Sequence, residues 1–200
     1  MTTIAAPVEI DTPHGPARVT RHEAAEPRAL MLLGHGAGGG IAAPDLLAAT
    51  KVALEAGVSV GLVEQPYRVA GRRAPAPAAQ LDAAWLAIVA AQGNDLPLLF
   101  GGRSSGARVA CRTATEGGAI GVLCLAFPEH PPGRPEKTRL PELLEPTVPI
   151  LVVQGANDPF GVPAPVGNRA VVVLRGDHSL KSDMPGLRAA VAAWLPLVLE

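Results

Sequence analysis

The residue with the clearest chemical potential in this sequence is a serine that stands between glycines. Residues 96–114 contain an apolar run, then GRSSG at positions 102–106, then a helix-like segment. A serine on a sharp turn from strand to helix has strained backbone, and the residues two positions away must be small so that strand and helix can approach each other. Ser104 has glycine at both of these positions, whereas Ser105 does not. The pattern predicts Ser104 as a nucleophile, although it also fits a plain glycine-rich turn after a buried strand.

Acyl transfer by a serine needs a base that takes its proton and an acid that orients the base. Two later loops offer these groups. Asp158 follows the apolar run 150–153 and His178 follows the run 171–174. Asp177 and Asp183 are alternative acids, but Asp177 adjoins the base in sequence and is expected to face solvent or bond locally. We therefore predict Asp158 as the acid and His178 as the base.

The other four histidines are weaker candidates for the base. His14 and His22 lie in or beside a predicted hairpin, and His130 lies in a proline-rich segment. His35 is near the predicted site, but it opens the glycine-rich loop, where its ring is expected to brace the loop backbone.

The glycine-rich loop GHGAGGG at residues 34–40 can bring backbone N–H groups close to a substrate. We expect the N–H groups of Ala37 and Ser105 to form the oxyanion hole, with Gly38 as the alternative to Ala37. Phosphate binding is a weaker interpretation, because the loop lacks the lysine of a P-loop and the acidic residue of a dinucleotide site. No metal or organic cofactor is predicted.

Charged residues near the predicted site are candidates for substrate binding. Arg68 and Arg103 can receive a carboxylate or phosphate, and His35 completes this candidate set. The alternative is that the arginines are solvated or structural, for example with Arg103 paired to a carboxylate such as Glu64.

Apolar runs alternate with helical patterns along most of the chain. This alternation predicts an α/β fold with a mainly parallel sheet and helices on both faces. In such sheets, functional residues collect at the carboxyl ends of the strands. The predicted strands are 8–10, 17–20, 30–33, 58–63, 96–100, 120–127, 150–153 and 171–174, and the predicted long helices are 44–56, 79–92, the segment after Ser104 and the C-terminal segment.

Length and composition restrict the broad class of protein. The 200 residues suit one domain over 1–200, and 48% hydrophobic residues indicate a globular chain. A net charge of −1 gives no reason to expect nucleic acid or an anionic membrane as partner. The N-terminal stretch has no secretory signal pattern, so a cytoplasmic location is expected. Cys111 and Cys124 are predicted to be buried and reduced.

The motifs GHGAGGG, GGRSSG, GANDPFG and GDHSL occur in this order, and the chain resembles the α/β-hydrolase superfamily. More narrowly, it is similar to a small group typified by testis-expressed protein 30 and related to dienelactone-hydrolase-like proteins. The resemblance implies an α/β-hydrolase fold without a large cap domain, and it carries the triad onto Ser104, Asp158 and His178. Dienelactone hydrolases typically have cysteine as the nucleophile, so the resemblance does not supply their substrate.

The predicted function is a serine hydrolase that cleaves a small ester or thioester through an acyl-serine intermediate. The alternative is a non-catalytic interaction module with the same fold. The sequence leaves open the substrate, hydrolysis versus acyl transfer, the oligomeric state and the role of residues 130–146.

Overall fold

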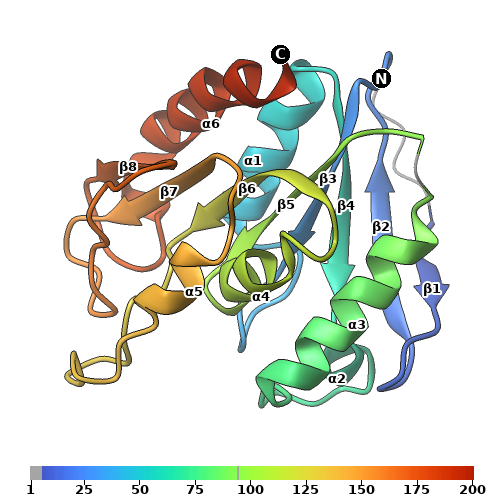
Figure 1. Cartoon of the computed structure of the whole chain (residues 1–200), viewed down its shortest axis with the longest axis horizontal. Helices are drawn as coiled ribbons and strands as arrows, with labels where there is room; N and C mark the ends of the chain where they lie inside the picture. The colour runs from blue at the N-terminus through green and yellow to red at the C-terminus, as the bar shows by residue number, and fades with distance from the viewer. Residues whose placement is uncertain (1–5, 94) are drawn as a thin grey trace.

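One sheet of eight strands runs through the part of the chain that the structure, a computed structural model, describes, residues 6–93 and 95–200. The strand order is β1-β2-β4-β3-β5-β6-β7-β8 (Figure 1). Strands β3 to β8 pair in parallel, while β1 and β2 form an antiparallel hairpin at one edge. The strands are β1 Val8–Ile10, β2 Ala17–His22, β3 Ala29–Gly34, β4 Val58–Glu64, β5 Leu98–Arg103, β6 Ala119–Leu125, β7 Ile150–Gly155 and β8 Arg169–Leu174.

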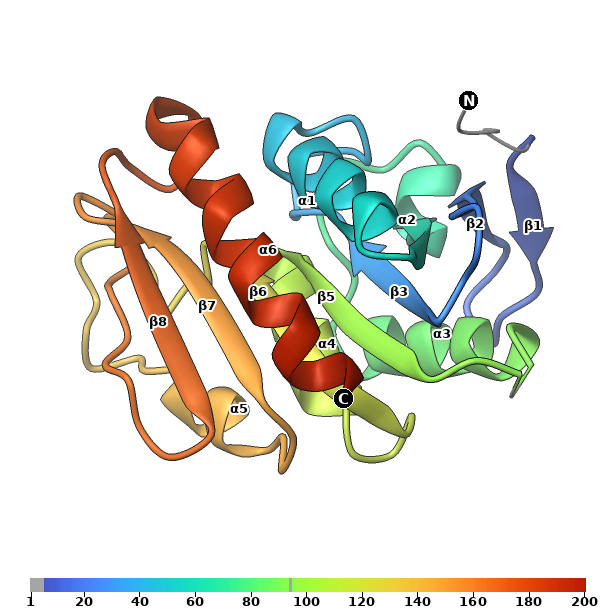
Figure 2. The same ribbon diagram turned by 90° about the horizontal axis from the view of Figure 1, so that it is seen from above.

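Helices cover both faces of this sheet (Figures 1 and 2). One core lies between the sheet and α1 and α6, and the other lies between the sheet and α3, α4 and α5. Strands β3 and β7 are buried along their whole length because both of their faces are covered, which explains their apolar runs without alternation. The helices are α1 Pro44–Glu55, α2 Pro66–Val69, α3 Ala78–Ala91, α4 Ser105–Thr113, α5 Leu140–Leu144, the 3₁₀ turn η1 Lys181–Asp183 and α6 Met184–Leu199.

The architecture confirms the predicted fold class: a mainly parallel sheet with helices on both faces and no large cap domain. All eight predicted strands are present, and β6 lies inside the sheet between β5 and β7. Two details differ from the prediction. The loop after β4 contains the short helix α2, which begins at Pro66, and β5 continues through both glycines to Arg103. The first five residues of the N-terminal stretch and of the expected 1–200 domain lie outside the described residues.

A group of ion pairs attaches α4 to its neighbours. Arg112 pairs with Asp82 on α3 at 2.7 Å and with Glu142 on α5 at 3.0 Å, and Arg108 pairs with the same Glu142. Since α5 belongs to the proline-rich segment 130–146, these pairs hold that segment against the helix that follows Ser104.

The two cysteines lie under this helix. Cys111 on α4 and Cys124 on β6 are buried and free, with their Sγ atoms 3.5 Å apart. Their burial agrees with the prediction, and no disulfide joins them.

A substitution at Trp85 tests the packing of the core between the sheet and α3. Its side chain is fully buried and makes an edge contact with Phe100 at a centroid distance of 5.6 Å. Trp85→Ala should lower the free energy of unfolding by about 3–5 kcal/mol in urea denaturation, because it leaves a cavity in the core. Leu197→Ala is the control, since Leu197 is 69% exposed and its change should cost about 0.5 kcal/mol or less. Equal losses for the two variants would contradict this assignment of the core.

Candidate active site

Ser104 occupies a strained turn between β5 and α4. Its φ is 53° and its ψ is −109°, a conformation that costs a non-glycine residue about 1–3 kcal/mol. The neighbouring glycines leave no room for side chains. A Cβ on Gly102 would lie 2.6 Å from the Gly34 oxygen, and a Cβ on Gly106 would collide with the same carbonyl. The structure therefore gives the steric reason for the glycine spacing and presents Ser104 at the end of the strand.

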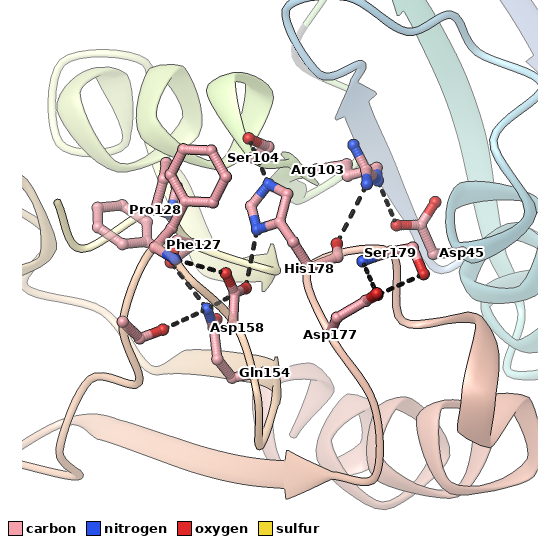
Figure 3. A network of polar contacts seen from close by, with 12 residues as sticks. Asp45, Arg103, Ser104, Phe127, Pro128, Gln154, Asp158, Asp177, His178 and Ser179 are labelled. Atoms are coloured by element: carbon pink, nitrogen blue, oxygen red, sulfur yellow. Dashed lines mark hydrogen bonds and ion pairs between the residues drawn. The ribbon is translucent and has the colours of Figure 1, made fainter. Parts of the chain in front are cut away.

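Ser104, His178 and Asp158 form one hydrogen-bonded series (Figure 3). The Ser104 Oγ lies 3.0 Å from His178 Nε2, and His178 Nδ1 lies 2.8 Å from an oxygen of Asp158. Because a carboxylate only accepts, Nδ1 carries the proton that it donates to Asp158, and Nε2 is left to accept the proton of Ser104. Three residues that are separated by 54 and 20 positions in the chain thus meet in the arrangement that serine acyl transfer requires.

Asp158 has other hydrogen-bond donors besides His178. The side chain of Gln154, which is fully buried at the end of β7, donates from Nε2 to the Asp158 carboxylate at 2.7 Å. The same Nε2 lies 3.0 Å from the Phe127 oxygen and 2.9 Å from the Gly161 oxygen. The backbone N–H of Phe160 donates to the second Asp158 oxygen at 2.8 Å. These donors fix the orientation of the carboxylate that His178 contacts.

Gln154 and Phe160 are functional candidates that the sequence reasoning missed. The ring of Phe160 lies against the His178 ring at a centroid distance of 4.3 Å, so it limits the positions that the imidazole can take. Gln154 did leave a signal in the sequence, because it is the polar residue at the end of the apolar run of β7, four positions before Asp158. We identify no signal in the sequence for the role of Phe160.

The alternative acid, Asp177, has a local role. Its carboxylate accepts hydrogen bonds from the backbone N–H and the hydroxyl of Ser179 at 2.9 and 2.7 Å. These bonds lower the pKa of the exposed Asp177 carboxyl below its ordinary value. The expectation that Asp177 bonds locally is confirmed.

His35 braces the glycine-rich loop, as the sequence suggested. Its Nδ1 lies 2.8 Å from the Gly36 oxygen, and its Nε2 accepts from the backbone N–H of Gln65 at 3.2 Å. Both ring nitrogens are therefore occupied by backbone groups, and the side chain is buried. This does not support the candidate role of His35 in contacting substrate.

The brace acts on the peptide that contains the expected oxyanion donor. The Gly36 oxygen and the Ala37 N–H belong to one peptide group, and in a trans peptide they point in opposite directions. No cis peptide occurs in the described residues. Since the oxygen points to His35, the Ala37 N–H points away from it, and no described residue accepts a hydrogen bond from this N–H. The hydroxyl of Tyr67 fixes the following peptide by donating to the Ala37 oxygen at 2.9 Å.

The two candidate arginines have different surroundings. Arg103 pairs with Asp45, with 2.8 Å between Nε and a carboxylate oxygen, and not with Glu64 as the sequence suggested. Its Nη2 also donates to the His178 backbone oxygen at 3.1 Å. Arg68 lies on α2 and donates to the Arg72 oxygen at 3.4 Å, and it has no hydrogen bond to the Ser104 series.

Within residues 6–93 and 95–200, no group of three or more histidine, cysteine, aspartate or glutamate side chains is placed to hold a metal ion. Over the same part of the chain, no helix combines the length and the apolar character that crossing a membrane requires.

Comparisons with known proteins agree with this architecture. A family profile described as Alpha/beta hydrolase domain matches residues 27–186. No curated protein matches the sequence.

Several solved structures share the fold over nearly the whole chain. An alpha-beta serine hydrolase homologue from Coxiella burnetii is 18% identical, with a TM-score of 0.75 over 98% of this chain and 99% of that chain. A Xanthomonas campestris protein described as a serine hydrolase without a lid is 20% identical, with a TM-score of 0.75 over 98% and 96% of the two chains. A dienelactone hydrolase from Anabaena variabilis is 16% identical, with a TM-score of 0.71 over 97% and 95%. These likenesses confirm the predicted fold, while the narrower resemblance to testis-expressed protein 30 stays a prediction.

The contacts of His35 predict a dependence of stability on pH. Burial lowers the pKa of His35 below its ordinary value of 6.5, and protonated Nε2 would face the Gln65 N–H that it now accepts from. The folded state therefore disfavours the charged ring. Its contribution to stability is complete above pH 6.5 and is lost as the pH falls from 6.5 through the lowered pKa.

The test compares the wild type with His35→Gln by urea denaturation at several pH values. His35→Gln should be less stable at neutral pH, because it loses hydrogen bonds, and this deficit should shrink on acidification. The pKa of His22 is also lowered by burial, but His22 is present in both proteins and cancels in the difference. A deficit that stays constant with pH would contradict a neutral, buried His35.

Proposed function

Because the chain belongs to the family of alpha/beta hydrolase domains, we propose that it is a serine hydrolase that cleaves a small ester or thioester. The observation that carries this proposal is the series Ser104, His178 and Asp158, with 3.0 and 2.8 Å between the paired atoms. Its direction of proton donation, from serine to imidazole to carboxylate, is the one that makes a serine hydroxyl nucleophilic.

The first step is attack by Ser104 on the substrate carbonyl. His178 Nε2 takes the hydroxyl proton as the Ser104 oxygen forms a bond to the carbonyl carbon, and the carbonyl electron pair moves onto its oxygen. Asp158 stabilises the resulting imidazolium through Nδ1–H. When the tetrahedral intermediate collapses, the bond to the leaving group breaks and His178 returns the proton to that group.

We assign two backbone N–H groups as the hydrogen-bond donors to the negative oxygen of this intermediate. One is the N–H of Ser105, which is the first residue of α4 and has no partner within the helix. The other is the N–H of Ala37, whose orientation follows from the bond between His35 and the Gly36 oxygen. The glycine loop is near enough for this role, because a Cβ on Gly36 would lie 3.6 Å from the Ser104 Cβ.

Water completes the reaction by the same route in reverse. His178 takes a proton from water, the water oxygen bonds to the acyl carbon, and Ser104 leaves with the proton from His178. All of these steps use side chains and backbone groups of the chain itself. The described chain has no large cap domain that would cover Ser104.

The experiment is intact-mass measurement after treatment with a neutral alkyl fluorophosphonate, which forms a stable bond only with an activated nucleophile. The wild type should gain one adduct, and Ser104→Ala and His178→Ala should gain none. Peptide mapping should place the wild-type adduct on Ser104. Asp158→Asn should label far more slowly, because it no longer holds the imidazole in the reactive tautomer.

Neighbouring residues provide matched controls. Ser105→Ala removes the adjacent hydroxyl and keeps the backbone N–H, and Asp177→Asn changes the carboxylate next to the base. Both variants should label like the wild type. A wild type that is folded but unlabelled would sink the hydrolase proposal and favour an interaction module, whereas an adduct on Ser105 would mean that the nucleophile is wrongly assigned.

A further inference from the structure

The loop that carries His178 is attached to the rest of the protein by an arginine next to the nucleophile. Arg103 is the last residue of β5, and its Nη2 donates to the backbone oxygen of His178 at 3.1 Å. Figure 3 shows the Arg103 guanidinium in contact with both the His178 backbone oxygen and the Asp45 carboxylate. One side chain thus links the strand that presents Ser104 to the loop that presents its hydrogen-bond partner.

Asp45 contacts the same guanidinium at Nε. It lies in the first turn of α1 and is only 1% exposed, and its Oδ2 is 2.8 Å from Arg103 Nε. Its Oδ1 accepts from the backbone N–H of Leu46 at 2.9 Å. Burial raises the pKa of Asp45, and the charge of Arg103 opposes this effect. A buried carboxylate of this kind is costly unless a cation faces it, so Arg103 is fixed in direction.

The hydrogen bonds within the His178 loop do not involve the His178 backbone oxygen. Leu180 donates to the Asp177 oxygen at 3.1 Å, and Asn157 donates to the Gly176 oxygen at 2.8 Å, but neither contacts the His178 peptide oxygen. Among the described residues, Arg103 is the donor to that oxygen. Removing the Arg103 side chain would leave the His178 backbone oxygen without this donor, at the residue that carries the imidazole.

We propose that Arg103 and Asp45 are a positioning pair that holds the His178 backbone so that its ring reaches Ser104 and Asp158. This inference rests on the proposed function, and it replaces the role in binding an anionic substrate that the sequence suggested for Arg103. The structure favours a positioning role for Arg103 because its Nε contacts Asp45 and its Nη2 contacts the His178 oxygen. The Asp45 carboxylate also balances the charge of the Arg103 guanidinium.

The first readout is the rate constant for labelling by the neutral fluorophosphonate. Arg103→Met should label about 10- to 100-fold more slowly than the wild type, as expected when a charged donor is lost. Arg103→Lys keeps the charge but reaches one partner at a time, so its rate should be intermediate. The probe carries no anionic group, so a slower rate cannot arise from lost recognition of a substrate anion.

The second readout does not depend on activity. The His178 Nδ1–H that donates to Asp158 should give a downfield proton NMR signal, which His178→Ala assigns by its disappearance. Arg103→Met and Asp45→Asn should broaden or shift this signal while urea denaturation shows that the variants are folded. If the wild type shows the signal but takes no label, the proposed function fails and the positioning pair is judged by the signal alone.

Arg175→Met is the matched control, because Arg175 donates to the Ser182 oxygen at 3.0 Å beside the same loop but not to His178. It should match the wild type in both readouts. A folded Arg103→Met that labels at the wild-type rate and keeps the downfield signal unchanged would overturn the proposal.

Chemical rescue separates positioning from general loss of structure. Arg103 lines an open cavity of about 370 Å³ together with Gly39, Ser179 and Lys181, so a small cation can reach its place. Millimolar guanidinium should restore part of the labelling rate of Arg103→Ala, and the neutral isostere urea should not. Equal effects of the two additives would count against the positioning pair.

Discussion

The contact between backbone atoms at Gly34, Gly102 and Gly106 is the constraint on which the site depends. A Cβ on either of the last two would run into the Gly34 carbonyl, so β3, β5 and α4 approach each other only with glycine there. Ser104, which stands between Gly102 and Gly106, has a positive φ. The close approach also places the glycine-rich loop after β3 beside the serine. The positions proposed for the nucleophile and for the oxyanion donor therefore both depend on this close approach.

A connected set of hydrogen bonds links the core of the sheet to Ser104. Gln154 donates to Asp158, and Asp158 accepts from His178, whose free nitrogen meets Ser104. Each side chain contacts the next one, and the first, Gln154, is fully buried near the end of β7. Breaking one of these hydrogen bonds would leave a polar group with fewer partners in a buried region, which is costly. The precision of the site therefore comes from the core of the sheet and not from the surface loops alone.

Two histidines illustrate how surroundings assign different roles to one residue type. His35 has both nitrogens bonded to backbone and is buried, so it serves the geometry of the loop. His178 is partly exposed and has a hydroxyl at one nitrogen and a carboxylate at the other. Only the second arrangement can move a proton between a substrate and the protein. The family assignment and the fold are compatible with both roles, and the local contacts distinguish them.

The sequence by itself determined the strands, because runs such as IGVLCLAF and ILVV are apolar on both faces, and it placed Ser104, Asp158 and His178 after strand ends. Only the tertiary structure decided which side chains meet. Arg103 and the His178 oxygen are 75 positions apart. The sequence offered a structural carboxylate such as Glu64 as a partner of Arg103, and the packing of strands and helices brings Asp45 there. Local patterns record burial and turn geometry, whereas contacts between distant residues depend on how the elements pack.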